Sequence, residues 1–230
     1  MEKINVQFFE GEYDDEGVYV YQAYCDSIAN YAIENQKFGG SLFDTKRMTW
    51  IKPSFAWVLY RSGYATKHNQ ERVLKIKLSH KAIAEILEKC SCKHGGGGSF
   101  GRVQWDPARD LYMAEDGEPR KMLNKRAIQI GTKGPISEFY VNSILSIQDV
   151  TALAHKVGIA HGVLIDNGGV IEKNNKHNNS IHFDDKLLKE LPEEKKYMPH
   201  CKKSVLENLA MEPGKTADDV AKIGKGKTIL

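Results

Sequence analysis

Residues 48–64 read Met-Thr-Trp-Ile-Lys-Pro-Ser-Phe-Ala-Trp-Val-Leu-Tyr-Arg-Ser-Gly-Tyr, and they combine aromatic and basic side chains with an apolar framework. Pro53 disfavours the helical conformation at the residue before it, so the chain that leads into it is expected to be extended. Ser54 is a favoured N-cap and Gly63 a favoured helix stop, which together predict a short helix over residues 55–61. The segment is therefore predicted to turn from extended chain into helix.

The side chains of this segment have two explanations. Indole and phenol rings beside an ammonium and a guanidinium group can hold a flat ring system by stacking and an anion by charge. The same mixture is found at the end of an amphipathic helix whose basic side chains extend to solvent. From residue 44 to residue 77, eight basic residues stand against two acidic ones. That excess suits a ligand bearing phosphate and equally suits a solvated positive face.

Working outward, alternating apolar and polar residues predict strands, and apolar residues at helical spacing predict helices. The predicted strands are residues 17–24, 71–78, 102–105 and 126–131, and the predicted helices are residues 28–38, 80–89 and 136–145. Asp106-Pro107 is expected to break the third strand, and Asp149 to act as a cap or strand-end acceptor. The order of elements predicts an α+β fold with a mixed, mostly antiparallel sheet flanked by helices.

The length of 230 residues is enough for one domain with an appendage. We expect residues 1–165 to form the catalytic or ligand-binding domain. Residues 166–230 are predicted to be a Lys/Glu-rich C-terminal extension, because residues 172–230 carry twelve lysines, ten acids and no arginine. Residues 95–99, Gly-Gly-Gly-Gly-Ser, are expected to form a flexible loop.

Composition bears on location and on metal binding. The chain has no apolar run of membrane-spanning length and no signal-peptide core at its N-terminus, so we expect a cytoplasmic or nuclear protein without a membrane partner. The four cysteines lack the spacing of a disulfide framework, so reduced thiols are expected. Cys90-Ser91-Cys92 is not a C-x-x-C pair, and no metal is predicted.

Three residues are candidates for catalysis: Lys52, Asp106 and Gln129. Desolvation of Lys52 would make it a nucleophile or base, whereas a charged Lys52 would bind phosphate. The Asp106 carboxylate suits a general base or an acceptor for a ribose hydroxyl, and it equally suits the opening of a turn. The amide of Gln129 lies on an apolar strand and needs a partner, which either a ligand or a cross-strand amide supplies.

A second group of residues is predicted to bind the substrate. Arginine binds phosphate or carboxylate by paired hydrogen bonds, or it pairs with acidic side chains of the same chain. Glutamine amides suit hydroxyls or base edges, and aromatic rings suit stacking. The predicted substrate-binding residues are Gln22, Tyr24, Arg47, Trp50, Ser54, Tyr60, Arg61, Arg72, Arg102, Gln104 and Trp105.

Two segments resemble the hallmark motifs of a protein family, the domain of unknown function 4291. Residues 49–55, Thr-Trp-Ile-Lys-Pro-Ser-Phe, resemble its S/T-W-I-K-P-S-F motif, and residues 103–107, Val-Gln-Trp-Asp-Pro, resemble its V/I-Q-W-D-P-E-R motif. With shorter matching pieces, the resemblance covers about residues 17–157. Ala108 departs from the motif, which has Glu there. The family name implies no activity.

The order of the elements is also loosely similar to the ADP-ribosyltransferase architecture, which is an analogy of fold. It implies a nucleotide- or nucleic-acid-directed transferase with NAD as cofactor, in which an aromatic ring stacks on nicotinamide and basic groups hold the diphosphate. Gln129 would stand where such enzymes have a late Glu. Two alternatives remain open. One is an RNA or single-stranded nucleic-acid binding protein without catalysis, and the other is an RNA ligase in which ATP nucleotidylates Lys52.

Overall fold

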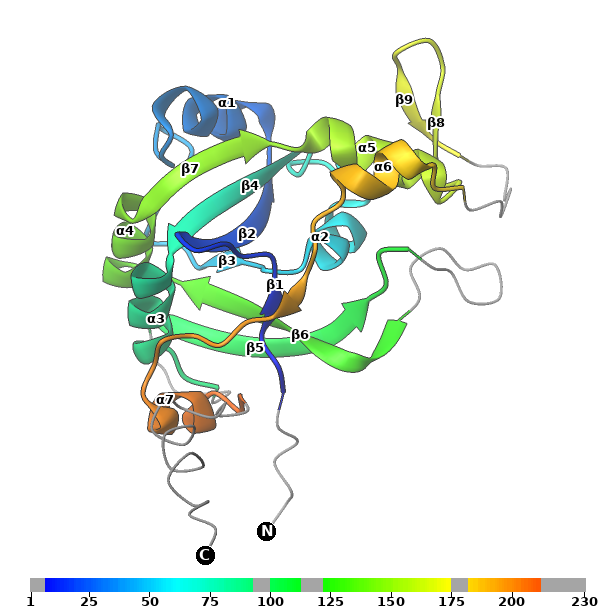
Figure 1. The fold of residues 1–230 in the computed structure, drawn as a ribbon. Helices are drawn as coiled ribbons and strands as arrows, with labels where there is room; N and C mark the ends of the chain where they lie inside the picture. The colour runs from blue at the N-terminus through cyan, green and yellow to red at the C-terminus, as the bar shows by residue number, and fades with distance from the viewer. Residues whose placement is uncertain (1–6, 93–99, 113–121, 175–181, 212–230) are drawn as a thin grey trace, which may run out of the picture.

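The fold is built on two three-stranded antiparallel sheets, one above the other in Figure 1. The computed structural model describes residues 7–92, 100–112, 122–174 and 182–211, so the predicted loop at residues 95–99 lies outside it. The first sheet has the order β2 (Gly17–Tyr24), β4 (Arg72–Ser79), β7 (Ile144–Asp149), and the second has the order β3 (Thr49–Ile51), β6 (Met122–Thr132), β5 (Gly101–Arg109). Two-stranded ribbons pair β1 (Glu10–Gly11) with β10 (Lys195–Lys196) and β8 (Leu164–Asp166) with β9 (Ile171–Lys173).

Helices close both ends of the pair of sheets. In Figure 1, α3 and α4 close one end of the pair of sheets, while α2 and α5 lie at the other. The helices are α1 (Asp26–Asn35), α2 (Phe55–Ser62), α3 (His80–Glu88), α4 (Pro135–Asn142), α5 (Thr151–Ala160), α6 (Asp185–Glu190) and α7 (Lys203–Asn208). The predicted α+β class is confirmed. No helix within the described residues is both long enough and apolar enough to span a membrane.

A backbone bridge between Tyr21 and Lys52 joins the two sheets. The Tyr21 N–H donates to the Lys52 carbonyl at 2.7 Å, and the Lys52 N–H donates to the Tyr21 carbonyl at 3.3 Å. The strands therefore follow one another as β7-β4-β2-β3-β6-β5 around a bent surface. The inner face of this surface carries buried Val20, Ile76 and Ile130, whereas the outer face packs against α2 and α5.

Local capping sets the bounds of the helix in the opening segment. The Ser54 hydroxyl accepts a hydrogen bond from the Trp57 N–H, and Gly63 ends α2 in the left-handed region at φ 60°. Ser79 caps α3 in the same way by accepting from the Ala82 N–H. The predicted strand-to-helix turn at Pro53-Ser54 is therefore confirmed, because the caps that define it are local in sequence.

The predicted break in the strand at Asp106-Pro107 is wrong, since β5 continues to Arg109. Proline lacks a donor, but β5 is an edge strand of its sheet, where a missing N–H on the open side costs no ladder hydrogen bond. The predicted helix 136–145 is too long. It ends at Asn142, because the residues from Ile144 pair with β4.

The C-terminal part of the described chain packs onto the sheets. Strand β10 pairs with β1, and Tyr197, Leu206 and Leu209 are buried in the same core as the inner sheet face. The apolar side chains of this Lys-rich segment are few, and several of them are buried, although Leu188 and Met198 are exposed. The division of the chain near residue 165 stays a prediction.

Candidate functional site

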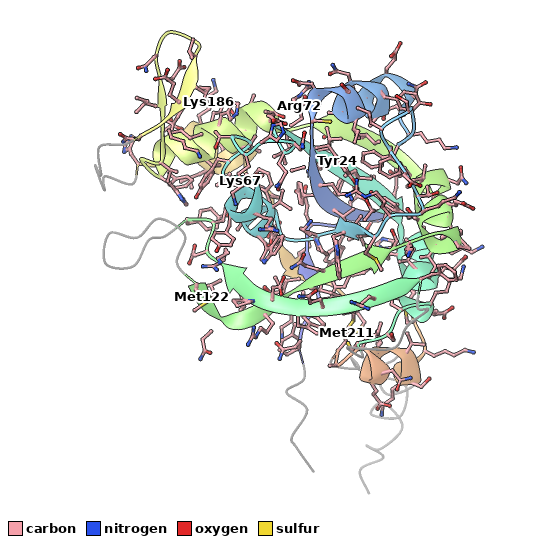
Figure 2. All side chains as sticks on the ribbon, turned by 180° about the vertical axis from the view of Figure 1, so that it is seen from behind. Tyr24, Lys67, Arg72, Met122, Lys186 and Met211 are labelled. Atoms are coloured by element: carbon pink, nitrogen blue, oxygen red, sulfur yellow. The ribbon has the colours of Figure 1, made fainter. Side chains whose placement is uncertain are left out.

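A cleft of about 370 Å³ opens on the outer face of the second sheet, beside α2. Its walls combine aromatic, basic, acidic and amide side chains. The residues that line it are Trp50, Lys52, Trp57, Tyr60, Arg61, Gln104, Asp106 and Gln129. Figure 2 shows this region from behind, with the side chains between α2, near the label of Lys67, and the strands below it. All of these residues except Trp57 were predicted from the sequence.

The register of the sheet explains why residues far apart in sequence meet here. Directly paired residues and residues two apart along a strand point to the same face. Trp50 pairs with Gly131, and Gln129 pairs with Gln104. Lys52 continues the register of β3 one position beyond the pair of Ile51 with Ile130. The floor therefore has three rows across the strands: Trp50–Gly131–Arg102, Lys52–Gln129–Gln104 and Ala127–Asp106.

Lys52 is held at the junction of the sheet and the helix. Its Nζ donates to the carbonyl of Trp50 at 3.1 Å and lies 5.2 Å from the centre of the Trp57 ring. The pKa of Lys52 is lowered to about 8, first by burial and second by the Arg61 charge, while the Asp106 carboxylate acts in the opposite direction. An amine with this pKa is present in both its charged and its neutral form near neutral pH, so it can bind an anion or act as a nucleophile.

Asp106 contributes the carboxylate of the cleft. Burial raises its pKa above the ordinary value, while a hydrogen bond from Gln104 and the charges of Arg126, Lys52 and Arg61 act in the opposite direction. The Gln104 Nε2 donates to Asp106 Oδ1 at 3.2 Å. A desolvated carboxylate that is held by one amide and surrounded by cations suits an acceptor or general base.

The helix α2 forms the wall of the cleft. Trp57, Tyr60 and Arg61 follow the i, i+3, i+4 spacing that places side chains on one helix face. The Arg109 guanidinium carbon lies 3.9 Å from the centre of the Tyr60 ring and covers one of its faces. The same spacing could have identified Trp57 as a cleft residue, because the helix was predicted and its two other cleft residues were already candidates.

The indole of Trp50 lies over Gly131, where the absence of a side chain leaves room for the ring. A Cβ atom on Gly131 would lie 3.1 Å from Cη2 and Cζ3 of Trp50 and 2.8 Å from Sδ of Met48. The carbonyl of Trp50 also accepts from Gln22 Nε2 at 3.2 Å. Both the ring and the backbone of Trp50 are therefore fixed before any ligand arrives.

Gln22 and Tyr24 lie away from the cleft, in a buried polar network. Gln22 accepts from the Tyr140 hydroxyl at 2.6 Å and donates to the Tyr24 hydroxyl at 3.0 Å. Burial raises the pKa of Tyr24 to about 12. Tyr24 and Arg47 line a separate pocket of about 410 Å³. Gln22 contributes to the cleft only by holding the backbone of Trp50.

The remaining candidates have other places in the structure. Ser54 is occupied as the cap of α2. Trp105 faces the inner side of the sheet, where its Nε1 donates to the Leu209 carbonyl at 2.9 Å. Arg102 shares the outer face with Gln104 but does not line the cleft.

Arg72 joins three elements and lies outside the cleft. Its guanidinium pairs with Asp26 at 3.0 Å and with Asp149, and it also donates to Asn30. We predict that Arg72→Met lowers the free energy of unfolding by about 1–2 kcal/mol, because partly buried Asp149 loses its partner. Urea unfolding measures this loss. Because Arg72 does not line the cleft, the variant is expected to keep the wild-type affinity for any ligand of the cleft. A variant of unchanged stability with lost affinity would place Arg72 in ligand binding instead.

Within the described residues, no group of three or more His, Cys, Asp or Glu side chains is placed to hold a metal ion.

Comparison with known proteins supports one assignment. No curated protein matches the chain. The family "Domain of unknown function (DUF4291)" matches residues 9–197, a span that contains both three-stranded sheets and every residue of the cleft. The chain therefore belongs to the DUF4291 family.

Proposed function

We propose that the chain is a transferase that acts on a nucleotide bound in the cleft between α2 and the second sheet. One observation carries this proposal: two cations, a carboxylate, two amides and three aromatic rings converge in a space of about 370 Å³. Ligand sites for small molecules have volumes of about 300–1,000 Å³ and place a few polar groups among rings and apolar walls. A nucleotide supplies the matching parts, which are a flat base, hydroxyls and phosphate.

The place of each group suggests its role. Lys52 and Arg61 bind the phosphate by charge. Among the described residues none makes a hydrogen bond or ion pair with the Arg61 guanidinium, which lines the cleft, while the Arg61 carbonyl accepts from Lys67 Nζ at 2.8 Å. The Trp50 indole offers a stacking surface for the base. Asp106 accepts a proton or hydrogen bond from the attacking or ribose hydroxyl. NAD is the expected donor if the transfer is of the ADP-ribosyl type.

The lowered pKa of Lys52 favours a second candidate. A neutral amine in a nucleotide cleft can attack the α-phosphate of ATP, forming a Lys52–AMP phosphoramidate and releasing pyrophosphate. Intact-protein mass spectrometry after incubation with ATP and Mg²⁺ tests this reaction. A mass increase equal to one adenylyl group, localised to Lys52, would support it. An unmodified protein leaves the NAD-type transfer as the proposal.

The test of nucleotide binding is a thermal-shift series with NAD, ATP, GTP and a short RNA. A ligand at 100 times its Kd stabilises the protein by about 2.7 kcal/mol, which is visible as a rise in Tm. Arg61→Ala is expected to weaken nucleotide binding about tenfold or more, because a charge-assisted hydrogen bond is lost. Arg47→Ala removes an arginine from the separate pocket and is the matched control.

Two results would count against the proposal. Equal effects of Arg61→Ala and Arg47→Ala would show that the cleft is not the binding site. A shift with RNA and with none of the nucleotides would favour the non-catalytic RNA-binding protein.

A further inference from the structure

We infer that Gln129 reads the hydrogen-bonding edge of the ligand's ring, so that the cleft recognises a planar ring with a donor beside an acceptor. This inference rests on the proposed function and deepens it. It assigns Gln129 to recognition, in place of the catalytic role expected from the sequence. The ring is a nucleobase or the carboxamide-bearing ring of nicotinamide, which share this edge chemistry.

The side-chain amide of Gln129 faces the cleft without a hydrogen-bond partner among the described residues. Gln129 lies in the middle row of the floor, is 5% exposed and lines the cleft. None of the described residues makes a hydrogen bond to its side chain. Its amide atoms are not among the fully buried polar atoms without a partner, so they are open to the cleft. A ligand that displaces solvent there must replace its hydrogen bonds, because a buried polar group left unpaired costs about 1–3 kcal/mol. A ligand in the cleft is the partner that the geometry leaves room for.

The side chains next to Gln129 either make hydrogen bonds to other groups or are small. Gln104, its cross-strand partner, donates to Asp106, and Lys52, on its other side, donates to the Trp50 carbonyl. Along β6 the residues on the same face are Ala127 and Gly131. The small side chains on β6 therefore leave the Gln129 amide accessible from the cleft. A ring that stacks against Trp50 can approach this amide with its edge.

The chemistry of the amide defines what it can pair with. A carboxamide presents a carbonyl acceptor beside an N–H donor. Glutamine pairs in this way with adenine, through the N6 donor and N7 acceptor. A phosphate or a sugar hydroxyl would use only half of this pair. A glutamate in the same place accepts twice and donates nothing, so it favours an edge with two neighbouring donors, as in the N1–H and N2–H₂ of guanine.

The test compares the affinities of AMP, GMP, nicotinamide mononucleotide and ribose 5-phosphate for wild type, Gln129→Leu and Gln129→Glu by isothermal titration calorimetry. Gln129→Leu is expected to weaken the preferred ring-bearing ligand about tenfold or more and to leave ribose 5-phosphate unchanged. Gln129→Glu is expected to raise the affinity ratio of GMP to AMP about tenfold or more. Because both ligands carry the same phosphate, repulsion by the new charge cancels in this ratio. Gln148→Glu, at an exposed position on β7, is the control.

Each outcome has one meaning. Equal losses for ribose 5-phosphate and the ring-bearing ligands in Gln129→Leu, or an unchanged GMP-to-AMP ratio in Gln129→Glu, would overturn the role of Gln129 while nucleotide binding by the wild type stands. The absence of binding by wild type for all four ligands would instead overturn the proposed function. A larger effect on nicotinamide mononucleotide than on AMP identifies the nicotinamide ring as the one that Gln129 reads, and the reverse identifies the base.

Discussion

Lys52→Met is expected to make the ligand-free protein more stable and to weaken the binding of a nucleotide in the cleft about tenfold to a hundredfold. Burial lowers the pKa of Lys52 from 10.5 to about 8, so the folded state bears a cost for keeping this amine charged. One pKa unit corresponds to about 1.4 kcal/mol, so a shift from 10.5 to about 8 gives a gain of about 3–3.5 kcal/mol for the methionine variant at pH 7. Methionine retains an apolar chain of similar length, so the packing against Trp57 is preserved.

The pH dependence of this gain has a defined sign. Below pH 8 the lysine is charged in both the folded and the unfolded protein, and the cost is fully present. Between pH 8 and 10.5 the folded state releases its proton first, so the stability of wild type rises with pH relative to Lys52→Met. Urea unfolding of both proteins at pH 7, 9 and 10.5 measures the difference.

Lys52→Met is also expected to bind a nucleotide more weakly than wild type. Removing the ammonium group costs a charge-assisted hydrogen bond, worth about 1.5–3 kcal/mol, so affinity for a nucleotide falls about tenfold to a hundredfold. Lys81→Met, whose side chain is 87% exposed on α3, controls for the loss of one positive charge. A destabilised Lys52→Met protein that still binds nucleotide would show that Lys52 is a structural residue.

Glu194→Gln is expected to remove a pH-dependent loss of stability. Glu194 comes from the segment that leads into β10, and its Oε1 accepts from the Phe55 N–H at 2.6 Å, at the start of α2. The pKa of Glu194 is raised to about 7. Burial is the main cause and the Glu10 charge acts in the same direction, while the Phe55 and Ser54 hydrogen bonds and the Lys125 charge oppose them. The cleft helix is thus held by a carboxyl group that titrates near neutral pH.

The sign follows from the direction of the shift. Between the ordinary value of 4.5 and about 7, the folded protein keeps a proton that the unfolded protein has released. The stability of wild type therefore falls as pH rises through this window, and the loss is complete above it. A glutamine does not titrate, so the advantage of Glu194→Gln over wild type grows from near zero at pH 4.5 to about 3–3.5 kcal/mol at pH 8.

Unfolding free energies at pH 4.5, 6 and 8 test this expectation. Glu193→Gln alters the exposed neighbour and should follow wild type at every pH. Parallel curves for Glu194→Gln and wild type would mean that Glu194 is ionised throughout the range, as an exposed cap of α2 would be.

The sequence alone predicted the elements whose signals are local. The cap at Ser54, the stop at Gly63 and the alternation of β2 lie within a few residues of the structure they specify. Seven cleft residues were named from residue chemistry, because aromatic, basic and amide groups in otherwise apolar elements are unusual in a core. The predicted strand break at Pro107 was wrong, because the effect of a proline on a strand depends on whether that strand lies at the edge of its sheet.

Only the tertiary structure decided which candidates share a site. Trp105 and Gln104 are adjacent in sequence, yet alternation along β5 sends one to the core and the other to the cleft. Arg61 and Arg72 were both predicted from the sequence to bind the substrate. In the structure Arg61 lines the cleft, whereas Arg72 pairs with Asp26 and Asp149. These outcomes depend on strand register and on partners supplied from distant parts of the chain. Short-range propensity carries no information about strand register or about these distant partners. The interaction energy that selects both arises only when the strands of the sheets pair.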